Sequence, residues 1–165
     1  MPTIRIQTQI HSTSKICFDL SRSIDLHQIS TASSKEKAIA GKITGLINLG
    51  ETVTWEAIHF GIRQQLTSKI TVFNRPHHFR DEQIKGAFKS FFHDHSFSTL
   101  GNIVVMEDVF TFQSPFGIIG QIVNELFLTG YMTELLMERN NVIKNYAETG
   151  KWTTVIRDEN FGKYI

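Results

Sequence analysis

Cysteine and net charge are both scarce in this sequence of 165 residues. Cys17 is the only cysteine, so an internal disulfide is excluded and a reducing compartment is favoured. The formal net charge is +1, so the chain has neither a basic field that would attract nucleic acid nor an acidic tail. We therefore predict that nucleic acid is not a partner.

Long apolar runs and catalytic motifs are absent as well. Residues 1–10 alternate between apolar and polar side chains and lack the apolar core of a signal peptide. No stretch approaches the roughly 20 apolar residues of a membrane span. These absences predict a cytoplasmic protein without integral membrane association. No P-loop, dinucleotide fingerprint, nucleophile elbow or zinc-finger spacing occurs, and we predict no cofactor.

Apolar residues are plentiful, and most of the aromatic ones lack a polar group. Hydrophobic residues make up 41% of the chain, which includes 13 Phe but only 3 Tyr and 2 Trp. Such rings suit an apolar interior or an apolar pocket. The length fits one domain. We predict a single domain over residues 1–165, in which 151–165 form a C-terminal tail.

The N-terminal part predicts one strand followed by two short helices. Ile4, Ile6, Thr8 and Ile10 share one side of an alternating segment, which is typical of a strand. Residues 12–14 offer an N-cap for a short helix that runs through Leu20. Ser23 is a candidate N-cap for a second helix over 24–30, and residues 35–40 predict a brief strand.

A series of strands joined by short turns follows. The predicted strands cover residues 52–60, 64–73, 79–86, 89–100 and 103–112. Short turns between successive strands predict an antiparallel meander.

Helical periodicity begins after the last strand, where Ser114 is a candidate N-cap and Pro115 suits the first helical position. The apolar face then changes side near Gly130. We predict either a kink there or a short helix before a longer one from about Leu126 to about Ala147. The two apolar faces consist of Ile118, Ile119, Ile122, Val123 and Leu126, and of Leu128, Tyr131, Met132, Leu135, Val142, Ile143 and Tyr146.

Three segments resemble bacterial proteins of the SRPBCC superfamily: residues 45–57, 91–97, and 106–110 continued through 114–117. The chain is most similar to the polyketide cyclase/dehydrase-like branch, and the resemblance extends over roughly residues 4–146. It implies an α+β helix-grip (Bet v 1/START-like) fold, in which a curved antiparallel sheet surrounds a long C-terminal helix. The superfamily includes lipid carriers, cyclases and hormone receptors, so the resemblance implies a cavity but no particular chemistry.

Strand alternation places a group of aromatic and titratable side chains on the concave side of the predicted sheet. This group consists of Trp55, His59, Phe91, His93, His95, Asp108 and Phe110. Arg139 belongs to the second apolar face of the helix, where a charge needs a partner or a route to water. It either extends to solvent at the sheet edge or pairs with Asp108 or an acidic ligand. We predict that all eight residues contact a ligand.

The histidines and Asp108 allow several interpretations. In the first interpretation they form a satisfied hydrogen-bond pair, and in the second they are polar anchors for a ligand. In the third the protein is an enzyme, and His93, His95 and Asp108 are its acid–base residues. A metal site would use His93 and His95, with a third ligand from His59 or Asp108. Because only the first two share a clear orientation, we predict no stoichiometric metal.

The leading hypothesis is non-catalytic binding of a small hydrophobic molecule (a lipid, an isoprenoid or an aromatic polyketide-like compound) between the sheet and the C-terminal helix. One alternative is a cyclase/dehydrase-type enzyme, and another is a protein-interaction module. The shape of the cavity distinguishes them. A closed aromatic tunnel favours the binder, an open cleft with His and Asp in hydrogen-bond reach favours the enzyme, and a filled core with an exposed apolar patch favours the module.

Overall fold

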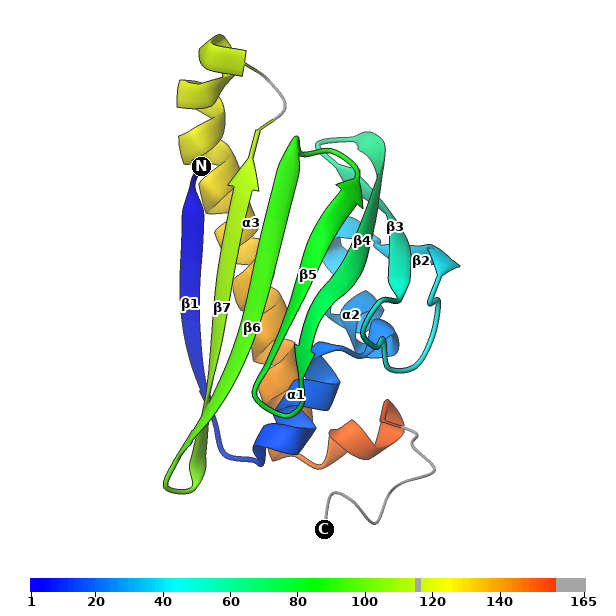
Figure 1. The fold of residues 1–165 in the computed structure, drawn as a ribbon, viewed down its shortest axis with the longest axis vertical. Coiled ribbons are helices and arrows are strands. Elements are labelled where there is room, and N and C mark those ends of the chain that lie inside the picture. The colour runs from blue at the N-terminus through cyan, green and yellow to red at the C-terminus, as the bar shows by residue number, and fades with distance from the viewer. Residues whose placement is uncertain (115–116, 157–165) are drawn as a thin grey trace.

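The computed structural model describes residues 1–114 and 117–156, with side chains throughout except at 117–126. A seven-stranded antiparallel sheet has the strand order β1-β7-β6-β5-β4-β3-β2. One long helix, α3, runs along one side of the sheet, and α1 and α2 pack against this helix (Figure 1). The predicted α+β class and the predicted order of elements are confirmed.

The observed boundaries differ from the predicted ones by a few residues at most strand ends. The strands are β1 (Thr3–Ile10), β2 (Lys37–Gly41), β3 (Thr52–His59), β4 (Ile62–Asn74), β5 (His78–Lys85), β6 (Ser90–Leu100) and β7 (Ile103–Gln113). The helices are α1 (Ser14–Ser21), α2 (Ile24–Ser30), η1 (Ala32–Ser34), α3 (Gly117–Glu148) and η2 (Lys151–Thr154).

Both short helices begin at the predicted caps. The Thr13 hydroxyl accepts a hydrogen bond from the Ile16 amide at 3.3 Å, and the Ser23 hydroxyl accepts one from the Leu26 amide at 3.2 Å. Each bond satisfies an amide that has no partner within its own helix. The cap within residues 12–14 therefore fixes the start of α1 after β1, and Ser23 fixes the start of α2.

The helix α3 is continuous through Gly130, so the predicted division into a short and a longer helix is wrong. A glycine in a helix interior costs only about 1 kcal/mol. Packing against β1, α1 and α2 outweighs this cost. Pro115 and the apolar face of residues 118–126 lie outside the part that the structure describes in side-chain detail, so the predicted cap at Ser114 stays a prediction.

Apolar side chains form two clusters between the sheet and the helices. The larger one surrounds Phe18, which is fully buried and meets three phenylalanine rings edge-on with centroids 5.2–5.4 Å away. The smaller one contains Phe91, Phe110 and Phe112. Ile156, at the end of the described chain, is fully buried against the larger cluster. In the described part of the chain, no helix has the length and hydropathy needed to cross a bilayer.

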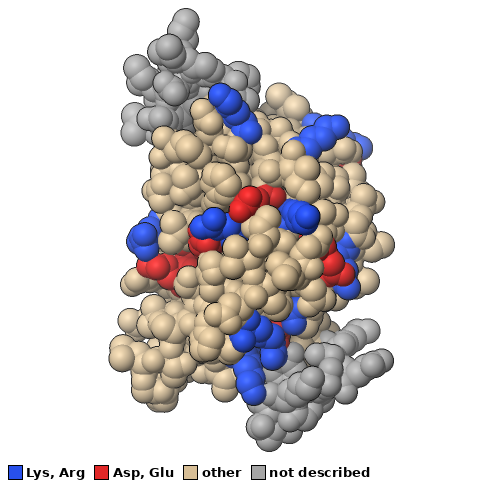
Figure 2. All heavy atoms as spheres, in the orientation of Figure 1, with Lys and Arg blue, Asp and Glu red and all other residues tan. Residues whose placement is uncertain are grey.

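The outer face of the sheet carries charges of both signs (Figure 2). The Arg80 guanidinium and the Asp94 carboxylate, for example, form an ion pair at 2.8 Å. Thr54 and Thr67 pair on this face across β3 and β4, with their hydroxyl oxygens 2.9 Å apart. This pattern fixes the opposite face as the one that packs on the helices.

The buried thiol of Cys17 leads to a first prediction. Burial raises the pKa of Cys17 to about 12, so almost no thiolate is present near neutral pH. We expect folded protein at pH 8 to leave Cys17 unmodified by Ellman's reagent, and denatured protein to release about one thiolate equivalent per chain. Rapid labelling of the folded protein, at the rate found in denaturant, would contradict this expectation.

Candidate functional site

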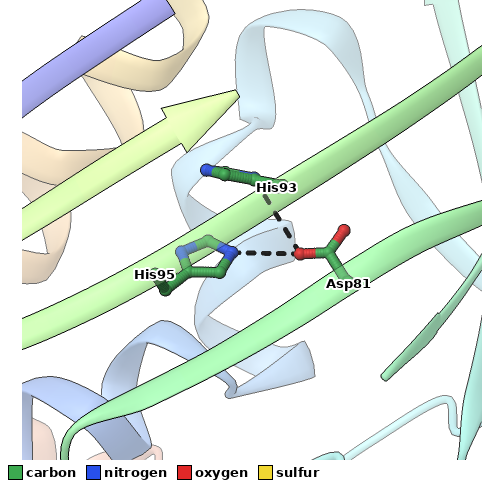
Figure 3. A group of neighbouring side chains, drawn as sticks. All are labelled: Asp81, His93 and His95. Atoms are coloured by element: carbon green, nitrogen blue, oxygen red, sulfur yellow. Dashed lines mark hydrogen bonds and ion pairs between the residues drawn. The ribbon is translucent and has the colours of Figure 1, made fainter. Parts of the chain in front are cut away.

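Three adjacent strands bring two histidines and two carboxylates together. His93 and His95 are two residues apart on β6, so both point to the concave face. Asp81 on β5 lies opposite His93 in the register, and Asp108 on β7 lies opposite His95. We call these four residues the Asp–His centre. Figure 3 shows Asp81 facing both imidazoles.

Asp108 lies on the far side of the two rings and is fully buried. It accepts hydrogen bonds from His93 Nε2 at 2.9 Å and from the Asn140 amide at 2.7 Å. His95 Nδ1 also lies 2.9 Å from Asp108 Oδ1, but it is poorly aligned and makes no hydrogen bond. The short distance still favours a positive charge on the His95 ring.

Asp81 lies on the opposite side of the rings, next to the cavity. Its Oδ2 is 3.0 Å from His95 Nε2 and 3.9 Å from His93 Nδ1. The Asp81 side chain retains 19% of its exposure, whereas the Asp108 side chain retains none. Asp81 is therefore the carboxylate of the Asp–His centre that a bound molecule can reach.

The surroundings move the pKa values of the two histidines in opposite directions. Burial lowers the pKa of His93, and the neighbouring His95 lowers it further. Burial alone would also lower the pKa of His95, but its contacts with Asp108 and Asp81 outweigh burial and raise it. The centre thus pairs a neutral imidazole with a more basic one.

The same contacts keep both carboxylates ionised. Burial alone would raise the pKa of Asp108, but the hydrogen bond from His93, the short contact with His95 and the charges of His95 and Arg139 hold it well below its usual range. Burial opposes ionisation of Asp81 too, and the hydrogen bond from His95 with the nearby positive charges lowers its pKa.

Arg139 is buried with only 6% of its surface exposed, so the alternative that it extends to solvent is wrong. Its guanidinium donates to the Ser21 carbonyl at 2.9 Å and to the Asn140 side chain at 3.2 Å. It also approaches Asp108 Oδ1 at 3.5 Å, as the ion-pair alternative predicts. These contacts connect α3 to α1 and to β7.

A cavity of about 160 Å³ lies between the sheet and the helices, next to the Asp–His centre. One side is formed by apolar and aromatic side chains, and Trp55 stacks on His27 at 4.1 Å between ring centroids. The residues that line it include Val53, Trp55, Ser68, Ile70, Phe79, Asp81, Phe91, His93, His95, Phe110, Met132, Leu135, Leu136 and Arg139. A larger hollow of about 760 Å³ lies beside Arg22 and Asp25, but none of the described residues lining it is aromatic.

The structure separates the eight predicted ligand-contacting residues into three groups. Trp55, Phe91, His93, His95, Phe110 and Arg139 line the cavity. Asp108 is on the correct face, but the rings in front of it shield it from the cavity. His59 is outside the cavity, because it is the last residue of β3, and its Nδ1 lies 2.7 Å from the Tyr131 hydroxyl.

Sequence reasoning missed Asp81 and Asn140. A signal for Asp81 exists: it alternates with Phe79 on β5 and so belongs to the concave face. That signal brings Asp81 to His93 only when the register between β5 and β6 is known. Asn140 follows Arg139 on α3 and carries no pattern that marks it.

No family model matches the sequence, and no curated protein matches it. Solved structures do match. TTHA0849 from Thermus thermophilus has a TM-score of 0.68 at 13% identity, over 86% of this chain and 97% of that one. Major latex-like protein 151 from Panax ginseng has a TM-score of 0.63 at 14% identity, over 88% and 97%. Ara h 8.0201 has a TM-score of 0.61 at 8% identity, over 86% and 97%.

The chain has the helix-grip fold. The match covers nearly the full length of these structures, and the curved sheet, the two short helices and the long C-terminal helix all correspond. The fold that the sequence resemblance implied is therefore confirmed. At identities of 8–14%, the likeness establishes the fold alone, and the polyketide cyclase/dehydrase-like branch stays a prediction.

Proposed function

We propose that this helix-grip chain binds a small, mostly apolar molecule in the cavity between the sheet and α3. The observation that carries the proposal is an aromatic-walled cavity lined by the partly exposed carboxylate of Asp81 and by a second carboxylate, Glu36, which pairs with His27 at 2.6 Å. Concave apolar sites with a few convergent polar groups are the usual form of small-molecule sites. The cavity favours this function over the protein-interaction alternative, which predicts a filled core.

The volume limits the size of the ligand. A protein cavity of about 150 Å³ accommodates benzene, so about 160 Å³ suits a compound with a single substituted ring. A lipid, an isoprenoid or a fused polyketide requires the flexible Met132 and its neighbours on α3 to move outward. We therefore place single-ring aromatic compounds ahead of these larger ligands.

The polar groups define the other end of the ligand. Asp81 Oδ2 faces the two imidazoles, so Oδ1 is the oxygen left to accept a hydrogen bond from a ligand. A phenolic hydroxyl or an amine supplies that donor. An aromatic ring buries about 150–250 Å², which contributes about 4–6 kcal/mol before association costs. Because association costs reduce this gain, we expect dissociation constants no tighter than the high-micromolar range.

An acid–base enzyme is the second candidate, because the Asp–His centre contains two histidines whose pKa values are shifted in opposite directions. A neutral His93 suits a general base and a protonated His95 suits a general acid. Both rings line the cavity, so a bound substrate would lie within reach of them. Asp108 orients the rings from behind and would not itself contact the substrate.

The binding function is tested with two small aromatic probes and with a variant in which a larger side chain occupies the cavity. We expect wild-type protein to bind 4-ethylphenol more tightly than ethylbenzene, because only the phenol has a donor for Asp81. Ser68 is buried and lines the cavity from β4, whereas Lys69 points to solvent on the other face. Ser68→Phe should therefore weaken 4-ethylphenol binding at least about tenfold, and Lys69→Phe should leave it unchanged.

Isothermal titration calorimetry in the presence of EDTA measures both affinities, and circular dichroism checks that each variant is folded. The proposal fails if wild-type protein shows no saturable binding of either compound. It also fails if folded Ser68→Phe binds 4-ethylphenol as tightly as wild type does.

A further inference from the structure

The geometry points to a binding site for one divalent transition-metal ion, formed by Asp81, His93 and His95 (Figure 3). This site shares Asp81 with the proposed ligand site, but it does not require an apolar ligand to be bound. The metal-free interpretation of the sequence rested on the need to take a third ligand from His59 or Asp108. The structure supplies a different third residue, Asp81, so the ground for that interpretation is removed.

The ligand atoms have the spacing that a metal ion requires. One carboxylate oxygen and one nitrogen from each ring all lie within 4.8 Å of one another. Asp81 Oδ2 is 3.0 Å from His95 Nε2 and 3.9 Å from His93 Nδ1. Ligands about 2.1 Å from a metal are separated by about 3.0–3.5 Å in octahedral or tetrahedral geometry. A separation at the upper limit of 4.8 Å would therefore have to close by about 1.3–1.8 Å through side-chain movement.

Asp108 gives the site its outer support. It accepts a hydrogen bond from His93 Nε2 at 2.9 Å and lies 2.9 Å from His95 Nδ1, so it faces the ring nitrogens opposite the proposed ligand atoms. Metal-binding histidines commonly direct their second nitrogen to a carboxylate, which fixes ring orientation and strengthens the ligand. Here a single buried carboxylate faces both rings, and Asn140 holds it in place with a hydrogen bond of 2.7 Å.

The charges also favour a cation next to Asp81. Arg139 lies against Asp108 and offsets its charge. Among the described residues, no lysine or arginine forms an ion pair with Asp81. The Asp81 carboxylate is therefore free of a direct lysine or arginine partner among these residues and lies next to the two imidazoles. Two nitrogens and one oxygen suit Zn²⁺, Co²⁺, Ni²⁺ or Fe²⁺ better than Mg²⁺ or Ca²⁺, which prefer oxygen ligands throughout.

The three residues line one side of the cavity, so the remaining coordination positions would face its interior. Three protein ligands with free positions are typical of metal sites that exchange water or bind a substrate oxygen, whereas purely structural sites are closed by four protein ligands. The aromatic walls would restrict access of bulk water to those positions.

Cobalt binding to tag-free, EDTA-treated protein without added organic ligand tests this inference. We expect visible d–d absorption that saturates at one Co²⁺ per chain and that Zn²⁺ displaces. His93→Ala removes a direct ligand and Asp81→Asn replaces the anionic ligand by a neutral amide, so each should weaken Zn²⁺ binding by more than the roughly 10–100-fold that loss of an outer-shell partner costs. Asp108→Asn should weaken it within that 10–100-fold range.

His78→Ala is the matched control. His78 and Asp94 form a pair at 2.7 Å on β5 and β6, the same strands that carry Asp81 and His93, but the pair belongs to the opposite face. Its removal should leave metal binding unchanged. The inference is overturned if wild-type protein shows no saturable one-to-one binding, if folded Asp81→Asn keeps wild-type affinity, or if His78→Ala abolishes binding. Asp81 is partly exposed, so Asp81→Asn decides the question even where His93→Ala does not fold.

Discussion

Replacement of Asp108 by alanine is expected to lower the free energy of unfolding by about 3–5 kcal/mol. Asp108 is fully buried and contacts His93, His95 and Arg139. Without it, the Arg139 guanidinium loses its carboxylate partner in a buried environment, and Asn140 loses its acceptor. A buried charge without a partner is far more costly than a lost surface contact, which accounts for the size of the effect.

Asp94→Ala provides the comparison. Asp94 also pairs with a histidine and an arginine, at 2.7 Å and 2.8 Å, and it lies on the neighbouring strand. Its side chain is 21% exposed, so solvent replaces the lost partner and we expect a change of at most about 1 kcal/mol. Urea unfolding at pH 7 measures both values. Equal losses in the two variants would contradict the assignment of Asp108 as the buried support of the Asp–His centre.

Low pH provides an independent check on Asp108. Its folded pKa is depressed, so its ionic contribution is complete above the unfolded value of about 3.9 and declines as the pH falls towards the folded pKa. The stability difference between wild type and Asp108→Ala should therefore narrow as the pH falls below about pH 4.

Phe18→Ala is expected to destabilise the protein by about 3–5 kcal/mol, through loss of packing rather than of charge. Phe18 is fully buried on α1, and its ring meets Phe73, Phe79 and Phe97. Its removal leaves a hole between α1 and the sheet that these rigid rings cannot readily fill. Thermal and urea unfolding measure the loss.

Phe92→Ala is the control for Phe18. Phe92 is 36% exposed on the outer face of β6, where the Arg80 guanidinium lies 5.9 Å from its ring centroid. We expect a loss of no more than about 1 kcal/mol from this contact. A Phe18→Ala variant that loses as little as Phe92→Ala would show that α1 is not anchored to the sheet by this cluster.

The two proposals on the cavity differ in what they require. Ligand binding depends on the volume beside Trp55 and Phe91, whereas metal binding depends only on the three atoms supplied by Asp81, His93 and His95. Loss of phenol binding in Ser68→Phe with cobalt binding intact would separate them experimentally. If wild-type protein binds both the phenol and cobalt, the cavity would hold a metal ion next to the polar end of an aromatic ligand.

The sequence alone determined the features that depend on local chemistry. Alternation with a period of two placed His93, His95 and Asp108 on the inner face, because successive side chains of a strand point to opposite sides. Residues 12–14 and Ser23 marked the helix starts, because a hydroxyl satisfies a free amide at such a position. These signals extend over only a few residues, so they can be recognised in the sequence without knowledge of the fold.

Tertiary structure decided the features that depend on how distant segments meet. The register between β5 and β6 brought Asp81 to the histidines, and the end of β3 left His59 outside the cavity. Contacts with β1, α1 and α2 carried α3 through Gly130 despite the change in its apolar face. The cavity volume is likewise the space left after side chains from the sheet and all three helices have packed, and no local pattern encodes that remainder.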